Sequence, residues 1–323
     1  MVPHGMIGES APMLRLRAQI EAFAAMPWPA LVLGETGSGK EAVARALHAA
    51  SPRGSAAFVA INCASVPDEL AESTFFGHER GAFTGAERRR PGLLERVGTG
   101  TLFLDEIGEL SPRIQAKLLR VFQEGVYTRV GGDEELPFAG RIVAATHREL
   151  REEGTFRADL YHRLATFVLR VPALRERRED IPDLARFLLA RACSQIPGGA
   201  RVTLSPDALR VLIDQPWPGN VRELENTLRA GLALAVALGR DVIGVEQLGV
   251  EAPPPADVGL LDATEAFQRG MVERVVAANA GNKTRAAREL GVSRQWLHGL
   301  LDRWESPRRP DHKRVAARGR MAG

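Results

Sequence analysis

The sequence has few cysteines, no long apolar run and no secretion signal. Its 323 residues include only Cys63 and Cys193, which are too few and too far apart for a disulfide framework. No stretch of about 18 apolar residues occurs, so we expect no transmembrane helix. Residues 1–5 show no basic segment followed by an apolar one, so we expect no secretion signal. These absences favour a reduced, cytoplasmic protein without a membrane partner.

The composition fits a chain with several folded domains. With 45% hydrophobic and 26% charged residues, the chain can bury a core and stay soluble, and its length suits two or three domains. The net charge of +3 is unevenly distributed, because residues 282–323 hold eleven Lys or Arg against four Asp or Glu. This basic end indicates contact with nucleic acid. For its last part, residues 306–323, we favour the alternative of a solvated, disordered tail.

Residues 31–48 predict a strand, a glycine-rich loop and a helix in that order. Leu31-Val32-Leu33 is typical of a buried strand end, and apolar residues recur on one face of the segment after Lys40. The glycines let backbone N–H groups point at phosphate oxygens, the helix adds its positive dipole end, and Lys40 supplies a charge for the outer phosphates. The predicted phosphate site comprises Gly34, Glu35, Thr36, Gly37, Ser38, Gly39, Lys40 and Glu41.

Two adjacent acids, Asp105 and Glu106, end the apolar strand predicted at residues 101–104. Burying two carboxylates there is costly without a cation. We predict that Asp105 holds Mg²⁺ and that Glu106 polarises an attacking water. The alternative for this acidic pair is a surface turn after an edge strand. The alternative for the predicted phosphate site is a glycine turn with an unrelated lysine. Glu41 stands where such loops usually carry Ser or Thr, which helps to hold magnesium.

Strands that alternate with helices predict a parallel sheet with helices on both faces. Asn62 ends a strand at residues 57–62, and Thr146 and His147 end another at residues 141–147. Ligands bind at the carboxyl ends of such strands, so Thr146 and His147 are candidates for sensing the terminal phosphate. A lone histidine after a strand is otherwise a hydrogen-bonded capping residue.

Other segments predict helices and loops around this sheet. We expect helices at residues 13–20 and 113–125 and a polar, glycine-bearing loop at residues 127–136. Prolines bound the segment 171–182, and beyond it the pattern predicts only helices, with Asn220 capping one of them.

The segment 81–86 places a phenylalanine and a threonine between glycines, with charged residues on both sides. It predicts a mobile loop tip that presents Phe83 to another molecule. The alternative is an ordinary turn with Phe83 packed inward. The residues of this loop are Gly81, Ala82, Phe83, Thr84, Gly85 and Ala86.

Arg157 and Arg163 lie six positions apart in the sequence. Arginine can supply charge to a transferring phosphoryl group from a neighbouring subunit. The alternative is a surface salt-bridge motif. Because neither arginine has an evident partner in the sequence, we expect both to act at an interface between subunits.

The C-terminal part predicts a linker at residues 249–262, rich in proline, and then a helix at residues 263–280. Residues 282–301 predict helix, tight turn and helix, with Ser293 capping the second helix, which fits a DNA major groove. The alternative is a small helical interaction domain. The candidate DNA contacts are Lys283, Thr284, Ser293, Arg294, Gln295, Trp296 and His298.

Taken together, these motifs resemble the sigma-54-dependent transcriptional activators, or bacterial enhancer-binding proteins, of the AAA+ ATPases, with a Fis-like helix pair at the C-terminus. The resemblance runs from about Ile7 to Leu248. It implies an α/β AAA+ P-loop NTPase subdomain at residues 1–171 and a helical lid at 172–248. The linker is followed by an all-α helix-turn-helix domain at 263–305. The motifs that carry the resemblance are residues 34–41, 81–86, 101–110, 156–160 and 217–224.

The resemblance also implies roles for single residues around ATP. Asn62 matches the residue that restrains the catalytic Glu106 until the partner engages, and Arg157 and Arg163 match fingers that reach across a ring of subunits. Arg222 matches the lid residue that reads the nucleotide. Ile7, Gly8 and Thr146 also belong to the expected nucleotide site. His147 stands where many members carry Asn.

The implied function is transcription activation powered by ATP and Mg²⁺. A ring, expected to be a hexamer, would move the loop 81–86, through Phe83 and Thr84, against sigma-54 RNA polymerase and open the closed promoter complex. The helix pair would bind upstream DNA. Since no sensor domain precedes the ATPase in this sequence, we expect control by a separate inhibitor, by expression level or by another partner. The alternatives are a regulator resembling tyrosine-responsive repressors, which typically lack an intact loop of this kind, and a general AAA+ remodeller, which would not need the helix pair.

Overall fold

The computed structural model of the protein describes residues 6–150, 154–196, 202–250, 272, 275–276, 279 and 282–305. Its contacts divide the chain into two units, Met1–Ala252 and Pro253–Gly323. The first unit holds a sheet and a helical subdomain, and the second holds a helix pair. Within the described ranges, no helix is both long and apolar enough to cross a bilayer.

A five-stranded, wholly parallel sheet with the order β2-β5-β8-β1-β9 forms the centre of the first unit. All six residues of β8 are buried, as are the first three of β1, which explains the apolar runs of these strands. The predicted parallel sheet is therefore confirmed. Its strands are β1 (Ala30–Leu33), β2 (Phe58–Asn62), β5 (Thr101–Asp105), β8 (Arg141–Thr146) and β9 (Phe167–Arg170).

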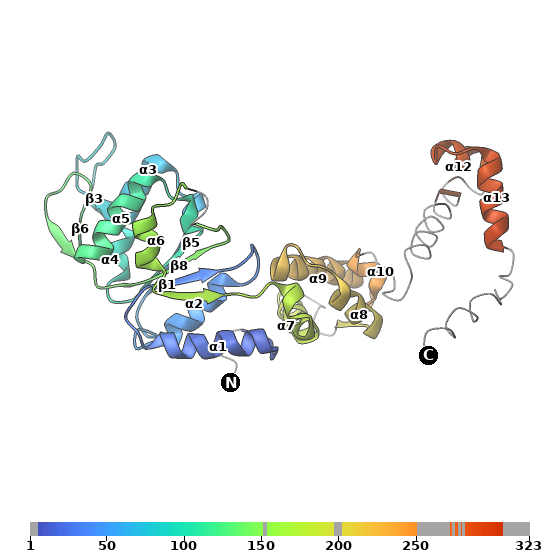
Figure 1. Ribbon diagram of the computed structural model, residues 1–323, viewed down its shortest axis with the longest axis horizontal. Coiled ribbons are helices and arrows are strands. Elements are labelled where there is room, and N and C mark those ends of the chain that lie inside the picture. Colours follow the sequence, from blue (N-terminus) through green and yellow to red (C-terminus); the bar gives the residue numbers. More distant parts are fainter. Residues whose placement is uncertain are drawn as a thin grey trace, which may run out of the picture. The chain divides into compact units, whose positions relative to one another are not determined.

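Helices cover both faces of the sheet (Figure 1). On one face, α1 and α2 share a core with β1 and β8, and on the other face α3 to α6 enclose a second core. Helix α5 buries Ile114, Leu118 and Val121, which recur at helical spacing. The helices are α1 (Ala11–Ala24), α2 (Lys40–Ala49), α3 (Asp68–Phe76), α4 (Leu93–Val97), α5 (Pro112–Glu124) and α6 (Ala158–Leu164).

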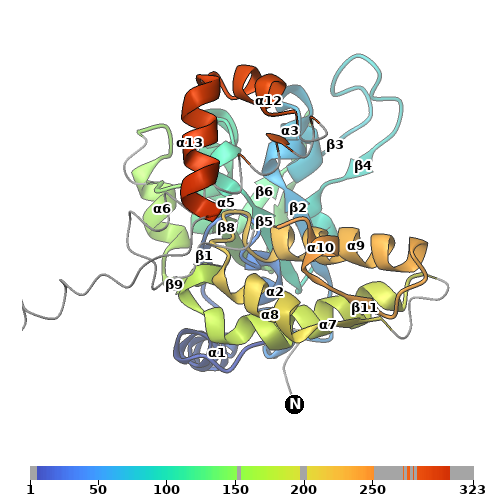
Figure 2. The same ribbon diagram turned by 90° about the vertical axis from the view of Figure 1, so that its right-hand side faces the viewer.

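Two hairpins extend from the sheet. Strands β3 (Gly77–His78) and β4 (Arg90–Pro91) pair antiparallel and carry a long loop that rises away from the sheet (Figure 2). The segment 127–136 is not the plain loop predicted, because β6 (Val126–Thr128) and β7 (Glu135–Pro137) pair antiparallel within it. Tyr127 is buried on that hairpin, and the burial of its large ring stabilises the paired strands.

The helical subdomain has a core of its own around Trp217, Leu224 and Leu228. The prediction of a purely helical subdomain is wrong, because β10 (Thr203–Leu204) and β11 (Val242–Ile243) form a short parallel pair. Two residues are too few to give a strand pattern in the sequence. The helices are α7 (Ile181–Cys193), α8 (Pro206–Asp214), α9 (Asn220–Ala237) and α10 (Val245–Leu248).

The second unit contains the predicted helix pair, α12 (Lys283–Glu289) and α13 (Arg294–Glu305). The Asn282 side chain accepts hydrogen bonds from the first turn of α12, and Ser293 Oγ accepts one from Trp296 N, so the predicted Ser293 cap is confirmed. Ala287, Leu297 and Leu300 pack together between the helices. Of the helix expected at 263–280, the described residues 272, 275 and 276 are helical. The linker beyond Val250 and the tail 306–323 lie outside the described residues.

Candidate functional site

The predicted phosphate loop lies between β1 and α2. Helix α2 begins at Lys40 after Gly39, whose φ of 107° is open to glycine without strain. Gly37 also has positive φ, and a Cβ there would collide with Gly219 O in the helical subdomain. The Lys40 side chain is only 7% exposed and donates to Gly34 O at 3.0 Å. The loop is therefore a compact turn around its own lysine.

Donors from the helical subdomain hold three successive carbonyls of this loop. Asn220 Nδ2 donates to Thr36 O at 3.1 Å, and Val221 N donates to Gly37 O at 3.0 Å. Arg177 Nη2 donates to Ser38 O at 3.1 Å. Because a trans peptide points its N–H opposite to its C=O, these contacts turn the N–H groups that follow away from the subdomain. That side of the loop is where a phosphate cradle needs donors.

Asn220 is wholly buried and has a φ of 54°. Its Oδ1 accepts a hydrogen bond from Leu174 N at 2.8 Å, and its Nδ2 donates to Glu35 Oε2 at 3.0 Å. Gly219, rather than Asn220, is the N-cap of α9, so the predicted capping role of Asn220 is wrong. The side chain instead joins the phosphate loop to the start of the helical subdomain, which is the predicted lid, because its amide carries both a donor and an acceptor.

The Glu35 carboxylate faces the lid. Arg175 binds it through two parallel hydrogen bonds of 2.7 and 2.5 Å. These bonds, with a further one from Asn220, hold the pKa of Glu35 at about 2, so the carboxylate is charged at neutral pH. The Glu35 side chain is therefore bound by the lid, so only its backbone is left for the predicted contact with the nucleotide.

The predicted acidic pair lies at the carboxyl end of β5. Glu106 has a φ of 51°, and its carboxylate accepts contacts from Lys40 Nζ at 3.2 Å and from His147 Nδ1 at 2.7 Å. Burial raises the pKa of Glu106, but the hydrogen bonds and charges of His147 and Lys40 outweigh it and lower the pKa overall. Burial, followed by the charge of Glu106, raises the pKa of Asp105. The charge of Lys40 opposes this rise in the pKa of Asp105 but offsets it only in part.

This environment fits Mg²⁺ at Asp105. Among the described residues, no group of three or more His, Cys, Asp or Glu forms a metal site. Magnesium in nucleotide sites takes one or two carboxylates and completes its shell with phosphate oxygens and water, so a single half-buried carboxylate beside the phosphate loop is sufficient. Nearby Cys63 is no candidate ligand or nucleophile, because burial and then the charges of Asp105 and Glu106 raise the pKa of its thiol to about 12.

Asn62 lies next to Asp105 in the sheet register but does not contact Glu106 through any described bond. Its Oδ1 accepts a hydrogen bond from Ala64 N at 2.9 Å, and its side chain is exposed. Thr146, fully buried at the end of β8, accepts from Arg148 N at 3.0 Å. The restraint of Glu106 by Asn62 stays a prediction, and in this structure His147 holds the carboxylate instead.

Both predicted finger arginines have partners in their own subunit. Arg157 forms an ion pair with Asp159 at 2.8 Å, and Arg163 donates two hydrogen bonds to Phe122 O at 3.0 and 2.8 Å. The premise that they lack partners is therefore wrong, because their long side chains fold back onto nearby acceptors. Both remain exposed, and their use between subunits stays a prediction.

The remaining nucleotide candidates lie where the sheet meets the lid. Arg222 follows Val221 at the start of α9, and its Cβ lies near Gly37. Ile7 packs against the lid core, and Gly8 approaches Asp180 too closely for a Cβ. Asp180 also accepts hydrogen bonds from the backbone of residues 9 and 10. The segment before α1 is therefore fixed to the lid.

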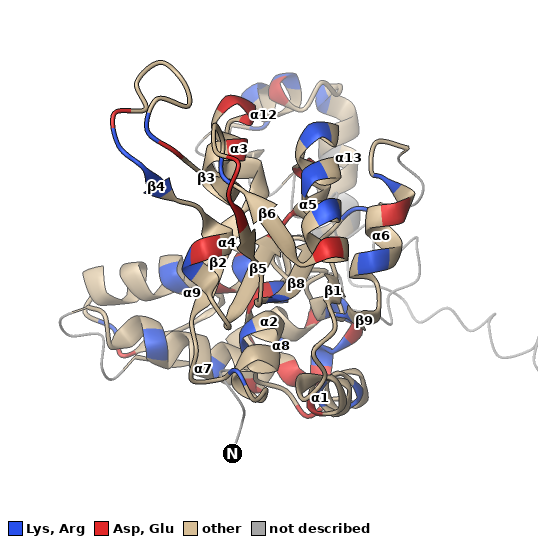
Figure 3. Ribbon diagram, turned by 90° about the vertical axis from the view of Figure 1, so that its left-hand side faces the viewer, with Lys and Arg blue, Asp and Glu red and all other residues tan. Residues whose placement is uncertain are grey.

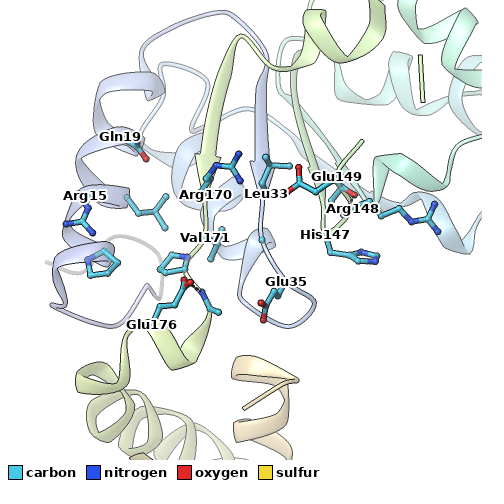
Figure 4. A pocket seen from close by; sticks show the side chains of 16 residues that line it. Arg15, Gln19, Leu33, Glu35, His147, Arg148, Glu149, Arg170, Val171 and Glu176 are labelled. Atoms are coloured by element: carbon cyan, nitrogen blue, oxygen red, sulfur yellow. Dashed lines mark hydrogen bonds between the residues drawn. The ribbon is translucent and has the colours of Figure 1, made fainter. Parts of the chain in front are cut away.

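A cavity of about 490 Å³ opens over the carboxyl ends of β8, β1 and β9. Figure 4 shows Arg15 and Gln19 of α1 on one side of it and His147 on the other, with Glu35 between them. Ligands of open α/β sheets bind at this edge. Of the predicted nucleotide residues, Gly34, Glu35 and Thr146 line this cavity together with His147, whereas Asp105 and Glu106 are not among its lining residues.

The loop 81–86 has an exposed tip. Phe83 and Thr84 are exposed, whereas Ala86 is buried, so the alternative of a Phe83 packed inward is wrong. That the tip presents Phe83 to another molecule stays a prediction. The Phe83 ring lies edge-on to His78 at 4.9 Å, which gives the tip a resting position. Figure 3 shows charged residues at the base of this loop and none at its tip.

The candidate DNA contacts belong to the second unit. Thr284, Ser293, Arg294, Gln295 and Trp296 are exposed, and Lys283 is partly buried. Nothing is described for the side chain of His298. These residues include the N-terminal turn of α13, which is the part of a recognition helix that reaches base edges.

Sequence reasoning missed Arg175 and Arg177, which lie in a segment that we interpreted only as a boundary. Both contact the phosphate loop, and Arg177 is 5% exposed. A cluster of Arg and Glu usually indicates a solvated surface, so nothing in the pattern separates these two from Arg178. The prolines that bound this segment are the one sequence feature that sets it apart, and they do not indicate a contact with the phosphate loop.

Known protein families match almost the whole chain. The Sigma-54 interaction domain matches residues 6–170, the AAA+ ATPase lid domain residues 175–254, and the bacterial regulatory protein, Fis family, residues 263–298. The anaerobic nitric oxide reductase transcription regulator NorR of Enterobacter sp. (strain 638) is 47% identical over 314 residues, which cover 92% of this chain and 62% of that protein.

Two further comparisons agree with these matches. The Nif-specific regulatory protein of Azotobacter vinelandii is 47% identical over 299 residues, covering 89% of this chain and 56% of that protein. The crystal structure of NtrX from Brucella abortus in complex with ATP is 34% identical with a TM-score of 0.71, covering 92% of this chain and 69% of that one. The chain thus spans about three-fifths of the length of the two curated relatives. It belongs to the sigma-54-dependent transcriptional activators, which combine an AAA+ ATPase domain and lid with a Fis-type helix-turn-helix.

Proposed function

We propose that the protein hydrolyses ATP between neighbouring copies in a ring and uses the energy to open a promoter complex held by sigma-54 RNA polymerase. The observation that carries this proposal is the combination, in one unit, of a phosphate loop with an acidic pair and an exposed Phe83–Thr84 tip. A protein that only binds a nucleotide would need the phosphate site but not the exposed tip. A protein that only docks on a partner, without energy input, would need the tip but not the phosphate site.

ATP binding is supported by the loop geometry and by the related NtrX, which was crystallised in complex with ATP. The loop N–H groups and Lys40 would hold the phosphates, and Arg222, beside Gly37, would read them from the lid. Mg²⁺ would sit at Asp105 and neutralise phosphate charge. Glu106 would polarise the attacking water once its carboxylate is released from its present partners.

A ring, which we take to be a hexamer, supplies what the single chain lacks. Arg157 and Arg163 are exposed and bound only to surface acceptors, so a neighbour's phosphoryl group can compete for them at low cost. An arginine finger stabilises the charge of the transferring group. Turnover should therefore depend on assembly.

The partners follow from the two exposed elements. The loop 81–86 would contact sigma-54 through an apolar and a hydroxyl side chain at its tip. The helix pair would bind an upstream DNA site, with Arg294 and Gln295 exposed at the start of α13 to reach base edges. Such a regulator would act in the cytoplasm, where its polymerase and DNA are found.

The proposal is tested by transcription from a sigma-54 promoter with Thr84→Ala. We expect open-complex formation to fall about tenfold or more, since a few residues near the centre of an interface carry most of its binding energy. ATP turnover should stay near that of the wild type, because Thr84 is exposed on the loop between β3 and β4, which rises away from the sheet (Figure 2). Thr203→Ala, on an exposed strand of the lid, is the matched control.

Two results would count against the proposal. Activation that survives Thr84→Ala would remove the loop as the sigma-54 contact. A wild-type protein that consumes no ATP with Mg²⁺, at concentrations high enough to assemble, would remove the energy source.

A further inference from the structure

Both oxygens of the Glu106 carboxylate are occupied in this structure. Oε1 pairs with Lys40 Nζ at 3.2 Å, and Oε2 accepts from His147 Nδ1 at 2.7 Å and from His147 N at 3.3 Å. The Glu106 side chain is 16% exposed, so water competes poorly for these positions. With three of its roughly four lone-pair sites in use, this carboxylate is poorly placed to take a proton from an attacking water.

The two partners of Glu106 differ in what ATP does to them. Lys40 is the cation of the phosphate loop, so the arriving phosphates compete with Glu106 for it. The His147 contact uses the opposite oxygen and is supported by the backbone N–H of the same residue. An ionised carboxylate only accepts hydrogen bonds, so His147 Nδ1 must carry the proton. The contact with His147 can therefore persist when ATP binds.

We propose that His147 is the positioning residue that keeps Glu106 inactive in the resting protein, and that release from His147 sets the basal rate of ATP hydrolysis. Asn62, to which the family resemblance gives this role, instead accepts from Ala64 N. His147 lies at the end of β8, directly after Thr146 and beside the cavity over the sheet edge. A ligand or neighbour that enters there can therefore reach the imidazole and free the carboxylate. The inference rests on the ATP hydrolysis proposed above but not on the sigma-54 contact.

The decisive pair of variants is His147→Leu and His147→Asn. Leucine removes the side-chain donor, whereas the Nδ2 of asparagine is the same number of bonds from the backbone as Nδ1 of histidine and can take its place. The His147 side chain is 41% exposed, so neither change disturbs a packed core. The measurement is steady-state ATP turnover of the full chain with Mg²⁺, without polymerase or DNA, at an assembling concentration.

We expect the kcat of His147→Leu to rise about tenfold, because Glu106 loses the side-chain donor that holds its charged carboxylate, and hydrogen bonds to charged groups are among the stronger ones. The KM for ATP should change little, since the phosphate loop is untouched. His147→Asn should keep the wild-type kcat. Asn62→Ala should raise kcat less than His147→Leu does. In a Glu106→Gln background, His147→Leu should give no rise, because the effect passes through that carboxylate.

Several outcomes would overturn the inference. An unchanged or lower kcat in His147→Leu would show that His147 does not restrain Glu106. An equal rise in His147→Asn would show that the Nδ1 donor is not the cause. A rise that persists in the Glu106→Gln background would place the effect elsewhere. If the wild type itself shows no turnover, the proposed ATP hydrolysis fails instead, so the two failures are distinguishable.

Discussion

The lid side and the hydrolysis side of the phosphate loop are built in different ways. On the lid side, Asn220, Val221 and Arg177 fix three successive loop carbonyls within one chain. On the hydrolysis side, Glu106 is held by Lys40 and His147, and the expected fingers contact their own subunit. The lid side can accept a phosphate as it stands. On the hydrolysis side, Glu106 and the two arginines must exchange their present partners before ATP can be hydrolysed.

Burial explains why the two sides can behave differently. Asn220 is fully buried and Arg177 nearly so, and leaving such groups unpaired costs about 1–3 kcal/mol each. The Arg157–Asp159 pair is about half exposed and is screened by solvent, so it contributes little to stability. The His147 side chain is 41% exposed, so it can leave Glu106 without disturbing a packed core. The lid contacts should therefore persist through a catalytic cycle, while those on the hydrolysis side can be replaced by ATP or by a neighbouring subunit.

The largest expected effect tests whether hydrolysis needs a second subunit. Arg163→Ala should lower kcat about a thousandfold, the lower end of the range for arginine fingers, while ATP affinity changes less than about twofold. Removing the side chain frees only Phe122 O, which is near the surface, so the fold should hold. Turnover and nucleotide binding are measured separately on the same preparation. Arg186→Ala, on the exposed face of α7, is the control, and normal turnover in Arg163→Ala would refute the finger role.

The elements that sequence reasoning found were those with strong local patterns. The apolar strands 101–104 and 141–146 give long buried runs, and the glycines at 37 and 39 allow the positive φ values of the turn between strand and helix. Acidic residues after an apolar strand also identify Asp105 and Glu106 directly. For these positions, neighbours in the sequence and the chemistry of the residue type are sufficient.

The contacts that sequence reasoning missed join residues far apart in the chain. Asn220 is separated by 185 positions from Glu35, and Arg175 by 140 from the same residue. Asparagine at the start of a helix predicts a cap from local geometry alone. The Asn220 side chain instead forms tertiary hydrogen bonds with Leu174 N and Glu35. Likewise, the sequence offers no means of seeing that Arg163 folds back onto Phe122. Such pairings depend on the packing of the lid, which periodicity does not specify.

A smaller effect tests whether the lid prepares the loop for ATP. Asn220→Gly should raise the KM for ATP about tenfold and lower the free energy of unfolding by about 1–3 kcal/mol, because Leu174 N and Thr36 O lose their partner. Glycine accepts the positive φ of this position, so the backbone is retained and only the amide is removed. The kcat at saturating ATP should stay within a few-fold of the wild type. Equal losses in kcat and in affinity would mean that the two sides are not independent.

Asn220→Asp sharpens the same test. Aspartate keeps the size and the acceptor but replaces the donor with a second carboxylate oxygen facing Glu35. We expect a larger rise in KM than with glycine, because like charges repel at this distance. If aspartate were tolerated better than glycine, the bond from Nδ2 to Glu35 would not be the important one.

The smallest effect concerns the ion pair between Glu35 and Arg175. Both side chains are 43% exposed, so solvent screening keeps the contribution of the pair to the unfolding free energy small despite the large pKa shift. The folded pKa of Glu35, about 2, lies below its ordinary value of 4.5, so the contribution is complete above pH 4.5 and is lost as the pH falls toward 2. Denaturant unfolding of the wild type and Glu35→Gln should therefore differ by a constant amount between pH 7 and pH 5 and converge in acid. A difference that instead vanished as the pH rose above 5 would mean that the carboxylate is not held by Arg175, and the lid side would then be as loosely paired as the hydrolysis side.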